Sequence, residues 1–175
     1  MTVCLYPDRV DIAAARVGPG ERPVLQSLES FERGGSDADA LMRIGKKFGL
    51  ARTNVTTLMP AKQYQLLTVE APTVPVEEVR EAVRWQIRDL VDFPVEQATL
   101  DVMDIPAASG RQKSVFVVAA RNDNVSRVMH NFLDAEIGLD TIDVHELAQR
   151  NIASLCAEPD RGIAMLSFDD AGGYL

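Results

Sequence analysis

Hydrophobic positions recur with two periods that alternate along this chain. Runs whose apolar residues alternate with polar ones, or cluster briefly as β-branched residues, predict strands, whereas apolar residues three or four apart predict helices. The predicted strands are Thr2–Leu5, Val10–Val17, Val24–Phe31, Val55–Met59, Tyr64–Glu70, Thr99–Ile105, Ser114–Ala120, Leu139–Val144 and Ile163–Phe168. The predicted helices are Asp37–Phe48, Val76–Val91, one from Asn122 or Asn124 to Gly138, and His145–Leu155. Because strands and helices are interleaved and the opening strands form a meander, we expect an α/β chain with a mixed sheet.

The helix predicted over Asp37–Phe48 carries both a start and a stop signal. Ser36 is a good N-cap, and the acidic residues after it suit the positive end of the helix dipole. Gly49 follows as a residue that can end the helix in the left-handed conformation. Leu41, Ile44 and Phe48 fall on one face at helical spacing, so we expect that face to be buried.

Two further helices have predicted buried stripes. In Val76–Val91 the stripe is Val79, Val83, Ile87 and Leu90, and Phe93-Pro94 stops the helix. In the helix that ends at Gly138, the residues expected to point inward are Val125, Val128, Met129, Phe132 and Leu133. Turn residues predict reversals at 18–23 and 159–162, and the connection at 107–112 is long enough for a hairpin loop.

The composition narrows the classes of protein. The chain has 175 residues, 46% hydrophobic and 25% charged, which is enough for one core or two small ones. Its net charge of −8 disfavours nucleic acid as the main partner, because phosphate backbones attract clustered Lys and Arg. Cys4 and Cys156 are too far apart in sequence to suggest a zinc site, and they suit a reducing compartment. Met1–Asp8 does not resemble a signal peptide and no apolar run could cross a bilayer, so we expect a cytoplasmic protein.

The end of the chain resembles an interrupted hairpin. Asp169–Leu175 contains a Gly-Gly turn whose return strand has only begun. A strand needs several residues to gain its ladder hydrogen bonds, so we expect the chain to be truncated from a longer protein.

One segment carries a family resemblance. Residues 64–94 read YQLLTVEAPTVPVEEVREAVRWQIRDLVDFP: a strand, a proline-spaced turn, Glu-Glu opening a helix with Ala-x-x-Trp-Gln/Glu-Ile, and a closing proline. Residues 98–106, ATLDVMDIP, continue the same pattern. This sequence resembles the PilM-like family of type IV pilus assembly, in the actin-like ATPase superfamily. Among the branches of that family it most resembles MshI of the mannose-sensitive haemagglutinin (MSHA) pilus system, and FtsA and the cytoplasmic domain of GspL are related.

The resemblance implies a fold and a set of partners. The fold is an actin-like (ribonuclease H-like) lobe with a mixed sheet and an inserted strand-helix-strand-strand subdomain of the SHS2 or 1C type. Residues 1–62 would be the first part of subdomain 1A, 63–138 the insert, 139–158 the return to 1A, and 159–175 the start of a second lobe. The implied protein is cytoplasmic and peripheral to the inner membrane through a partner. It binds the cytoplasmic tail of a PilN-like inner-membrane protein and works with the pilus assembly ATPase.

The sequence departs from actin-like ATPases at the nucleotide site. Those proteins place an Asp-x-Gly phosphate loop in the first hairpin, because bare glycine backbone lets N–H groups approach phosphate. The turn here is Tyr6-Pro7-Asp8-Arg9, which lacks glycine and loses a donor at the proline. Asp169–Gly173 matches the second phosphate loop only loosely. A magnesium site built from Asp8, Asp11, Asp169 and Asp170 is disfavoured, because turns readily recruit aspartate. We therefore assign no catalytic residue, cofactor or metal, and expect no enzyme.

Four residues are candidates for partner binding: Arg84, Trp85, Arg88 and Phe93. Trp85 lies opposite the predicted buried stripe; it either covers a neighbouring strand or lobe, which we favour, or anchors a partner. Arg84 and Arg88 are one turn apart; they either receive an acidic or carbonyl-rich peptide or, as we favour, pair with neighbouring carboxylates. Trp85 and Phe93 are also candidates for an exposed apolar patch.

Three functions follow from these observations. The first is a scaffold whose groove between lobes holds the tail of a PilN-like protein by backbone pairing and apolar pockets, with Val76–Val91 and Phe93-Pro94 along one wall. The second is an actin-like ATP-binding protein whose second lobe is missing. The third is a self-associating homo-oligomeric module. We expect the first, because the glycine phosphate loop required by the second is absent.

Overall fold

The computed structural model describes residues 1–19, 22–106, 112–156, 162–169 and 172–174. The chain divides into two compact units: Met1–Ala61 together with Val128–Leu175, and Lys62–Arg127. The first boundary adjoins the expected one at residue 62. The second lies inside a helix, before residue 138, where the insert was expected to end.

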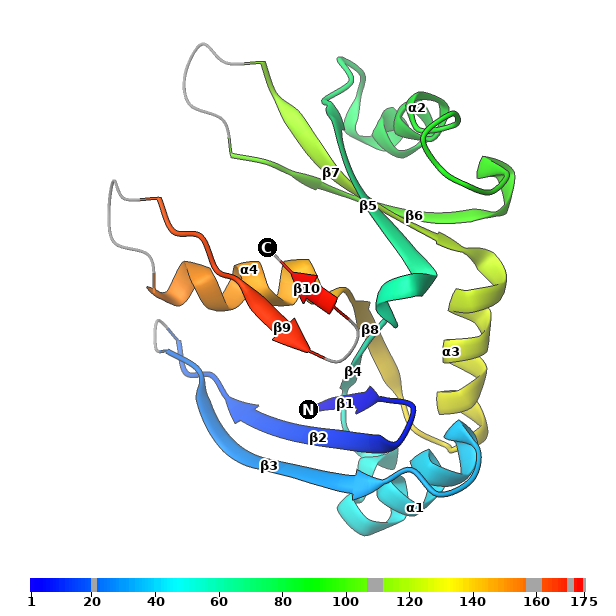
Figure 1. Cartoon of the computed structure of the whole chain (residues 1–175), viewed down its shortest axis with the longest axis vertical. Helices are drawn as coiled ribbons and strands as arrows, with labels where there is room; N and C mark the ends of the chain where they lie inside the picture. Colours follow the sequence, from blue (N-terminus) through cyan, green and yellow to red (C-terminus); the bar gives the residue numbers. More distant parts are fainter. Residues whose placement is uncertain (20–21, 107–111, 157–161, 170–171, 175) are drawn as a thin grey trace. The chain divides into compact units, whose positions relative to one another are not determined.

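The first unit is built on a five-stranded sheet of order β3-β2-β1-β4-β8. Its strands are β1 (Thr2–Leu5), β2 (Arg9–Arg16), β3 (Val24–Glu32), β4 (Val55–Leu58) and β8 (Leu139–Asp143). Strands β1, β2 and β3 pair antiparallel, whereas β4 runs parallel to both β1 and β8 (Figure 1). The expected meander and mixed sheet are confirmed.

The helices of this unit supply the other half of its core. They are α1 (Asp37–Phe48), the C-terminal part of α3 (Asn122–Asp134) and α4 (His145–Cys156). Val10 and Ile12 alternate along β2 and are buried, as are Leu41 of α1 and Phe132 of α3. The side-chain amide of Asn131 donates a hydrogen bond of 3.3 Å to the Asp37 carboxylate, which ties α3 to α1.

Helix α1 begins and ends where its signals predicted. The Ser36 hydroxyl accepts from the Asp39 N–H at 3.2 Å, and the Asp39 carboxylate accepts from the Ser36 N–H at 3.2 Å. This reciprocal capping box satisfies two N–H groups that the helix itself leaves unpaired. Gly49 ends the helix with φ 67°, a left-handed conformation that costs glycine little.

The second unit is a three-stranded antiparallel sheet of order β5-β7-β6 with a helix on one face (Figure 1). Its elements are β5 (Tyr64–Glu70), the short 3-10 turn η3 (Val76–Glu78), α2 (Val79–Gln86), β6 (Ala98–Asp104) and β7 (Ser114–Arg121). Val83 and Ile87 pack with Leu100, Val117 and Ala119 in a buried core. The predicted order strand-helix-strand-strand is confirmed.

Helix α2 is shorter than predicted. It ends at Gln86, not Val91, because the chain tightens into a turn in which the Leu90 N–H donates to the Ile87 carbonyl at 2.9 Å. The Asp92 N–H donates instead to the side chain of Gln65 on β5, at 3.3 Å. Leu90 is therefore exposed, and its predicted place in the buried stripe is wrong.

Two other predictions need correction. In α3, Val128 and Phe132 are buried but Met129 and Leu133 are exposed. The buried stripe of this helix is therefore narrower than predicted. The strand predicted from Ile163 begins only at Ser167. Its return strand is present, since β9 (Ser167–Asp169) pairs antiparallel with β10 (Gly172–Tyr174). The reversals predicted at 18–23, 107–112, 159–162 and 169–173 fall partly or mostly outside the described residues.

Candidate partner-binding surface

Trp85 lies on the outer side of α2, away from the unit's core, as helical spacing predicted. Its side chain is 59% exposed, and Arg88 one turn further on is exposed as well. A large exposed aromatic residue beside a cation is a composition typical of interface hot spots. Within this unit Trp85 does not take the packing role that we favoured.

Arg84 is held inside its own unit. Its Nη1 donates to the Val95 carbonyl at 2.6 Å and to the Ala98 carbonyl at 3.1 Å, and its Nε lies 3.5 Å from the Glu81 carboxylate. The predicted pairing with a neighbouring carboxylate is thus confirmed for Arg84. The guanidinium fastens α2 to the turn that leads into β6.

The prediction that Phe93 contributes to an exposed apolar patch is wrong. It is only 9% exposed and belongs to the α2 core, with the Arg121 guanidinium 5.4 Å from its ring centre. The proline after it leads into the short 3-10 turn η4 (Val95–Gln97). Phe93 therefore cannot form an exposed apolar patch. Of the four candidates, Trp85 on α2 and Arg88 in the turn that follows α2 are exposed.

A second apolar face lies on the side of the β5-β7-β6 sheet opposite α2. The strand register places Leu66 beside Val118, and Phe116 beside Met103. These four residues, called the second face below, are half-buried and lie outside the α2 core, which uses the alternate positions. The available signal was that Tyr64–Glu70 and Ser114–Ala120 are apolar at both odd and even positions, a pattern typical of strands covered on both sides.

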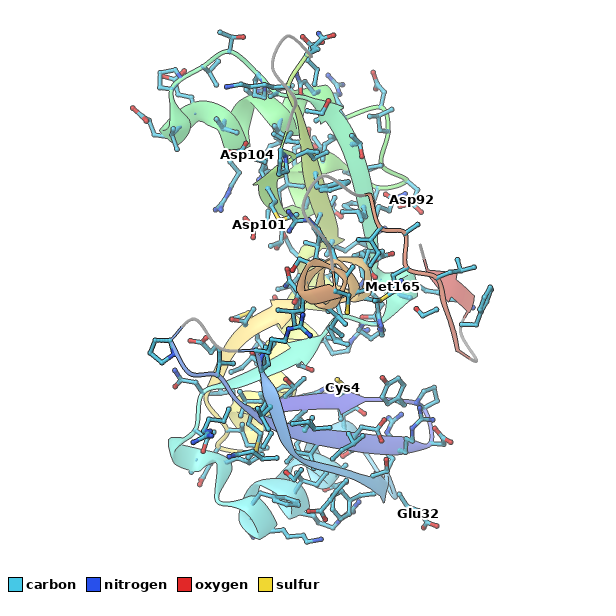
Figure 2. The ribbon with its side chains drawn as sticks, turned by 90° about the vertical axis from the view of Figure 1, so that its left-hand side faces the viewer. Cys4, Glu32, Asp92, Asp101, Asp104 and Met165 are labelled. Atoms are coloured by element: carbon cyan, nitrogen blue, oxygen red, sulfur yellow. The ribbon has the colours of Figure 1, made fainter. Side chains whose placement is uncertain are left out.

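Acidic residues follow the outer strand of this sheet. Asp101 and Asp104 lie on β6 and are exposed (Figure 2). Asp101 is 3.2 Å from the Arg80 guanidinium, but both side chains are so exposed that the pair adds little stability. Strands β5 and β6 are the two edges of this sheet, so each has an outer row of backbone groups unpaired by the sheet itself.

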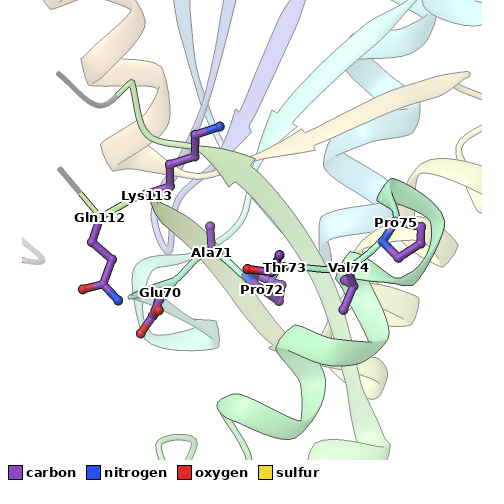
Figure 3. A pocket seen from close by; sticks show the side chains of 8 residues that line it. All are labelled: Glu70, Ala71, Pro72, Thr73, Val74, Pro75, Gln112 and Lys113. Carbon is purple, nitrogen blue, oxygen red and sulfur yellow. The ribbon is translucent and has the colours of Figure 1, made fainter. Parts of the chain in front are cut away.

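One cavity of this unit lies elsewhere, at the end of β5. It has a volume of about 540 Å³ and is open (Figure 3). Its lining residues are Glu70, Ala71, Pro72, Thr73, Val74, Pro75, Gln112 and Lys113. None of the four predicted partner-binding residues lines it, and its prolines have no N–H to donate to a ligand.

A family model and several solved structures match this chain. The model for type IV pilus assembly protein PilM matches residues 29–164. The chain belongs to the PilM family. A structure of the PilM–PilN type IV pilus biogenesis complex is 28% identical, with a TM-score of 0.69 over 91% of this chain and 52% of that chain. A search of curated proteins finds no match.

A second structure extends the likeness of fold beyond the PilM family. The cytoplasmic domain of EpsL, an inner-membrane component of the type II secretion system of Vibrio cholerae, is 17% identical, with a TM-score of 0.57 over 81% of this chain and 56% of that chain. The expected actin-like α/β fold is confirmed. The chain spans about half the length of these solved relatives.

The first hairpin of this PilM-family chain is closed by its own contacts. The Tyr6 N–H donates to the Arg9 carbonyl at 2.9 Å, and the Arg9 guanidinium lies 4.3 Å from the Tyr6 ring centre. Arg33 donates through its backbone to the Asp8 carbonyl and through its side chain to the Pro7 carbonyl, at 3.0 and 3.3 Å. The turn presents two carbonyls that are already bonded, and Pro7 has no N–H to offer a phosphate.

Two polar side chains near the first hairpin, Asp11 and Cys4, are held within the fold, whereas Asp170 and the side chain of Asp169 lie outside the described part of the chain. Asp11 accepts a 2.6 Å hydrogen bond from Ser30 and a 3.2 Å hydrogen bond from Arg9. Burial, helped by the charge of Asp11, raises the pKa of the Cys4 thiol to about 11, although a hydrogen bond with the Leu58 backbone acts to lower it.

Over the described ranges, no group of three or more His, Cys, Asp or Glu residues is arranged to hold a metal. Across the same ranges, no helix is long and apolar enough to span a membrane.

Proposed function

We propose that this chain is a non-catalytic scaffold of type IV pilus assembly that binds the cytoplasmic tail of a PilN-like inner-membrane protein. Membership of the PilM family supports the pathway, and the solved relative that forms a complex with PilN supports the partner. The sequence resemblance to MshI suggests an MSHA-type pilus. On this proposal the chain is cytoplasmic and reaches the inner membrane only through its partner.

The second face of the β5-β7-β6 sheet is the observation that carries the proposal. Leu66, Met103, Phe116 and Val118 offer apolar area beyond what the α2 core uses. The edges of the same sheet offer backbone groups to an added strand. Backbone pairing with alternate side chains in apolar pockets is how extended peptides bind sheets.

Charge complements this geometry. Cytoplasmic tails of inner-membrane proteins carry an excess of Lys and Arg. This chain has a net charge of −8, and exposed Asp101 and Asp104 lie on the β6 edge. Such complementarity speeds encounter and fixes orientation more than it raises affinity, and salt screens it.

The closed first hairpin supports the absence of catalysis. A phosphate loop requires free N–H groups, whereas the turn at Pro7 and Asp8 offers carbonyls already bonded to Arg33. We therefore propose that this chain does not hydrolyse ATP. A phosphate-release assay with MgATP should give the rate of a protein-free control, and hydrolysis that scales with protein concentration would contradict this.

The binding proposal is tested by titrating this protein with a fluorescent peptide that copies the cytoplasmic N-terminus of the PilN-like protein encoded beside it. We expect saturable binding that weakens as salt is raised. Phe116→Ala removes an aromatic ring from the second face and should weaken binding about tenfold or more. Trp85→Ala, a matched aromatic truncation on the opposite side of the same unit, should leave the affinity unchanged.

The opposite pattern would place the tail on α2 instead. If Trp85→Ala weakens binding and Phe116→Ala does not, the second face is not the site. Circular dichroism of both variants controls for unfolding, because Phe116 is half-buried. Absence of binding up to high micromolar peptide would contradict the partner itself.

A further inference from the structure

The backbone hydrogen bonds of the β5-β7-β6 sheet determine which groups each edge strand points outward. The Ala71 N–H donates to the Lys113 carbonyl at 2.9 Å, which continues the β5–β7 register. The Ile105 N–H donates to the Ser114 carbonyl at 3.1 Å, which continues the β6–β7 register. In an antiparallel ladder, residues alternate between those bonded to the neighbouring strand and those whose N–H and C=O point away from it. The odd-numbered residues of β5 and β6 therefore bond to β7, and the even-numbered residues point their backbone groups outward.

Side chains of the same unit cover part of the β6 edge. The outward carbonyl of Ala98 accepts from Arg84 at 3.1 Å. The outward N–H of Val102 donates to the Asp101 carboxylate at 3.0 Å. The Arg80 guanidinium lies 3.2 Å from that same carboxylate oxygen. A strand added to β6 would have to displace both contacts, and charged side chains on an edge strand are one way in which natural sheets block added strands.

The β5 edge lacks such covers. Within the described part of the chain, no hydrogen bond reaches the outward backbone groups of Leu66 and Thr68. The side chains of these two residues lie on the second face, because the register places them beside Val118 and Phe116. A peptide residue directly opposite Leu66 would share its face, so backbone pairing and apolar contact would occur at the same residues. At the β6 edge the second face ends instead at Asp101, whose side chain is 80% exposed.

We propose that the tail of the PilN-like protein binds as a fourth strand on β5, not on β6, with every second side chain on the second face. This inference rests on the proposed function and adds the edge that the tail occupies. The occupant is argued from the solved relative in complex with PilN, whose likeness covers 91% of this chain. The binding segment is therefore extended, with apolar side chains at alternate positions. Asp101 would lie three strand spacings away, about 14 Å, so it steers the tail's approach and does not pair with it.

Residue-resolved hydrogen exchange tests the edge directly. In nuclear magnetic resonance spectra of the isotope-labelled protein, the amides of Leu66 and Thr68 should exchange about tenfold or more slowly once the tail peptide saturates the protein. The amides of Leu100 and Asp104, which point outward from β6, should keep their rates. Slowing at Leu100 and Asp104 without slowing at the β5 positions would overturn the inference and leave the scaffold proposal standing.

Proline variants test the same point by affinity. Proline is tolerated on an edge strand where its missing N–H would face solvent, so Thr68→Pro should fold but weaken binding of the fluorescent tail peptide about tenfold or more. Thr68→Val keeps the N–H and the side-chain shape, and should bind as the wild type does. Asp104→Pro, the matched change on β6, should stay within about twofold of the wild type, since it removes only a steering charge. Both positions are exposed, and circular dichroism checks that each variant is folded.

The outcomes separate this inference from the proposed function. The inference is overturned if folded Thr68→Pro binds as tightly as Thr68→Val, or if Asp104→Pro loses affinity instead. If Phe116→Ala weakens binding but neither proline variant does, the tail lies on the second face without pairing as a strand, and only the inference fails. Absence of peptide binding to the wild type would overturn both. If Thr68→Pro does not fold, the exchange rates of Leu66 and Thr68 in the wild type still decide the edge.

Discussion

Arg84 and Arg88 are chemically identical and four residues apart, yet the structure uses them differently. The Arg84 guanidinium donates to two backbone carbonyls within its unit, while Arg88 is exposed in the turn that follows α2. A hydrogen bond from a charged donor in a partly buried position contributes more to the free energy of unfolding than an exposed ion pair does. The two arginines therefore make a matched pair for testing what a partly buried contact is worth.

Arg84→Met should lower the free energy of unfolding by about 1–3 kcal/mol, because it leaves the carbonyls of Val95 and Ala98 without this donor. Arg88→Met should change it by less than about 0.5 kcal/mol. Urea denaturation followed by circular dichroism measures both. Equal effects of the two substitutions would contradict the structural role of Arg84.

Cys4, on the first strand, should make the stability of the folded protein depend on pH. Its thiol has a pKa raised from 9.0 to about 11, by burial first and by Asp11 second. The folded state therefore holds this proton more tightly than the unfolded state does, and stability should fall as pH rises from about 9 to 11, by up to about 2 kcal/mol. Thermal denaturation of the wild type and Cys4→Ala across this range isolates the effect. Parallel pH profiles for the two proteins would show that Cys4 does not contribute.

At the scale of the element, α1 shows what a complete set of local signals achieves. Ser36 and Asp39 satisfy each other's backbone groups at one end, and Gly49 supplies the left-handed exit at the other. Because these interactions are local in sequence, they define the ends of the helix before any packing is known. The contrast is α2, whose end depends on a hydrogen bond from Asp92 to Gln65 on another strand.

Ser36→Ala should cost about 1 kcal/mol of stability at pH 7. Hydrogen bonds from the Ser36 hydroxyl and backbone lower the pKa of Asp39. The stability that the Asp39 carboxylate adds through these hydrogen bonds is therefore present above the usual aspartate pKa. It is lost as pH falls through the lowered pKa that Asp39 has in the folded state. The difference between wild type and Ser36→Ala should shrink in acid, while Ser27→Ala, on an exposed strand, should have little effect at any pH. A difference that stays constant down to pH 2, below the usual pKa of the carboxylate, would argue against the capping box.

At the scale of the whole molecule, the two units have separate cores. Val117 is buried in Lys62–Arg127 and Val55 is buried in the other unit. Regions with their own buried core tend to open as cooperative units. Each core should therefore govern the opening of its own part of the chain.

Val117→Ala should destabilise its unit by about 2 kcal/mol and speed hydrogen exchange mainly in Lys62–Arg127. Val55→Ala should produce the reverse pattern. Exchange followed by mass spectrometry distinguishes the two sets of peptides. If either substitution accelerates exchange equally in both units, the chain opens as a single cooperative body.

The candidate surface was only partly predictable. Helical spacing alone placed Trp85 on the outside, and the structure agrees. Phe93 was a candidate for an exposed apolar patch, but its ring is buried in the α2 core. The second face was not predicted, because Leu66 and Phe116 come from strands far apart in sequence and meet only through β5–β7 pairing.

The sequence by itself determined the family, the order of strands and helices, the meander and the caps of α1, because periodicity, turn residues and capping act over a few neighbouring positions. Only the tertiary structure decided where α2 ends, which apolar residues of α3 are buried, and which arginine is fastened to the fold. Each of these depends on a partner from another element, such as Gln65 for Asp92 or the carbonyl of Val95 for Arg84. Long-range pairing also placed β3 at the edge of its sheet, where Leu25 and Leu28 are exposed.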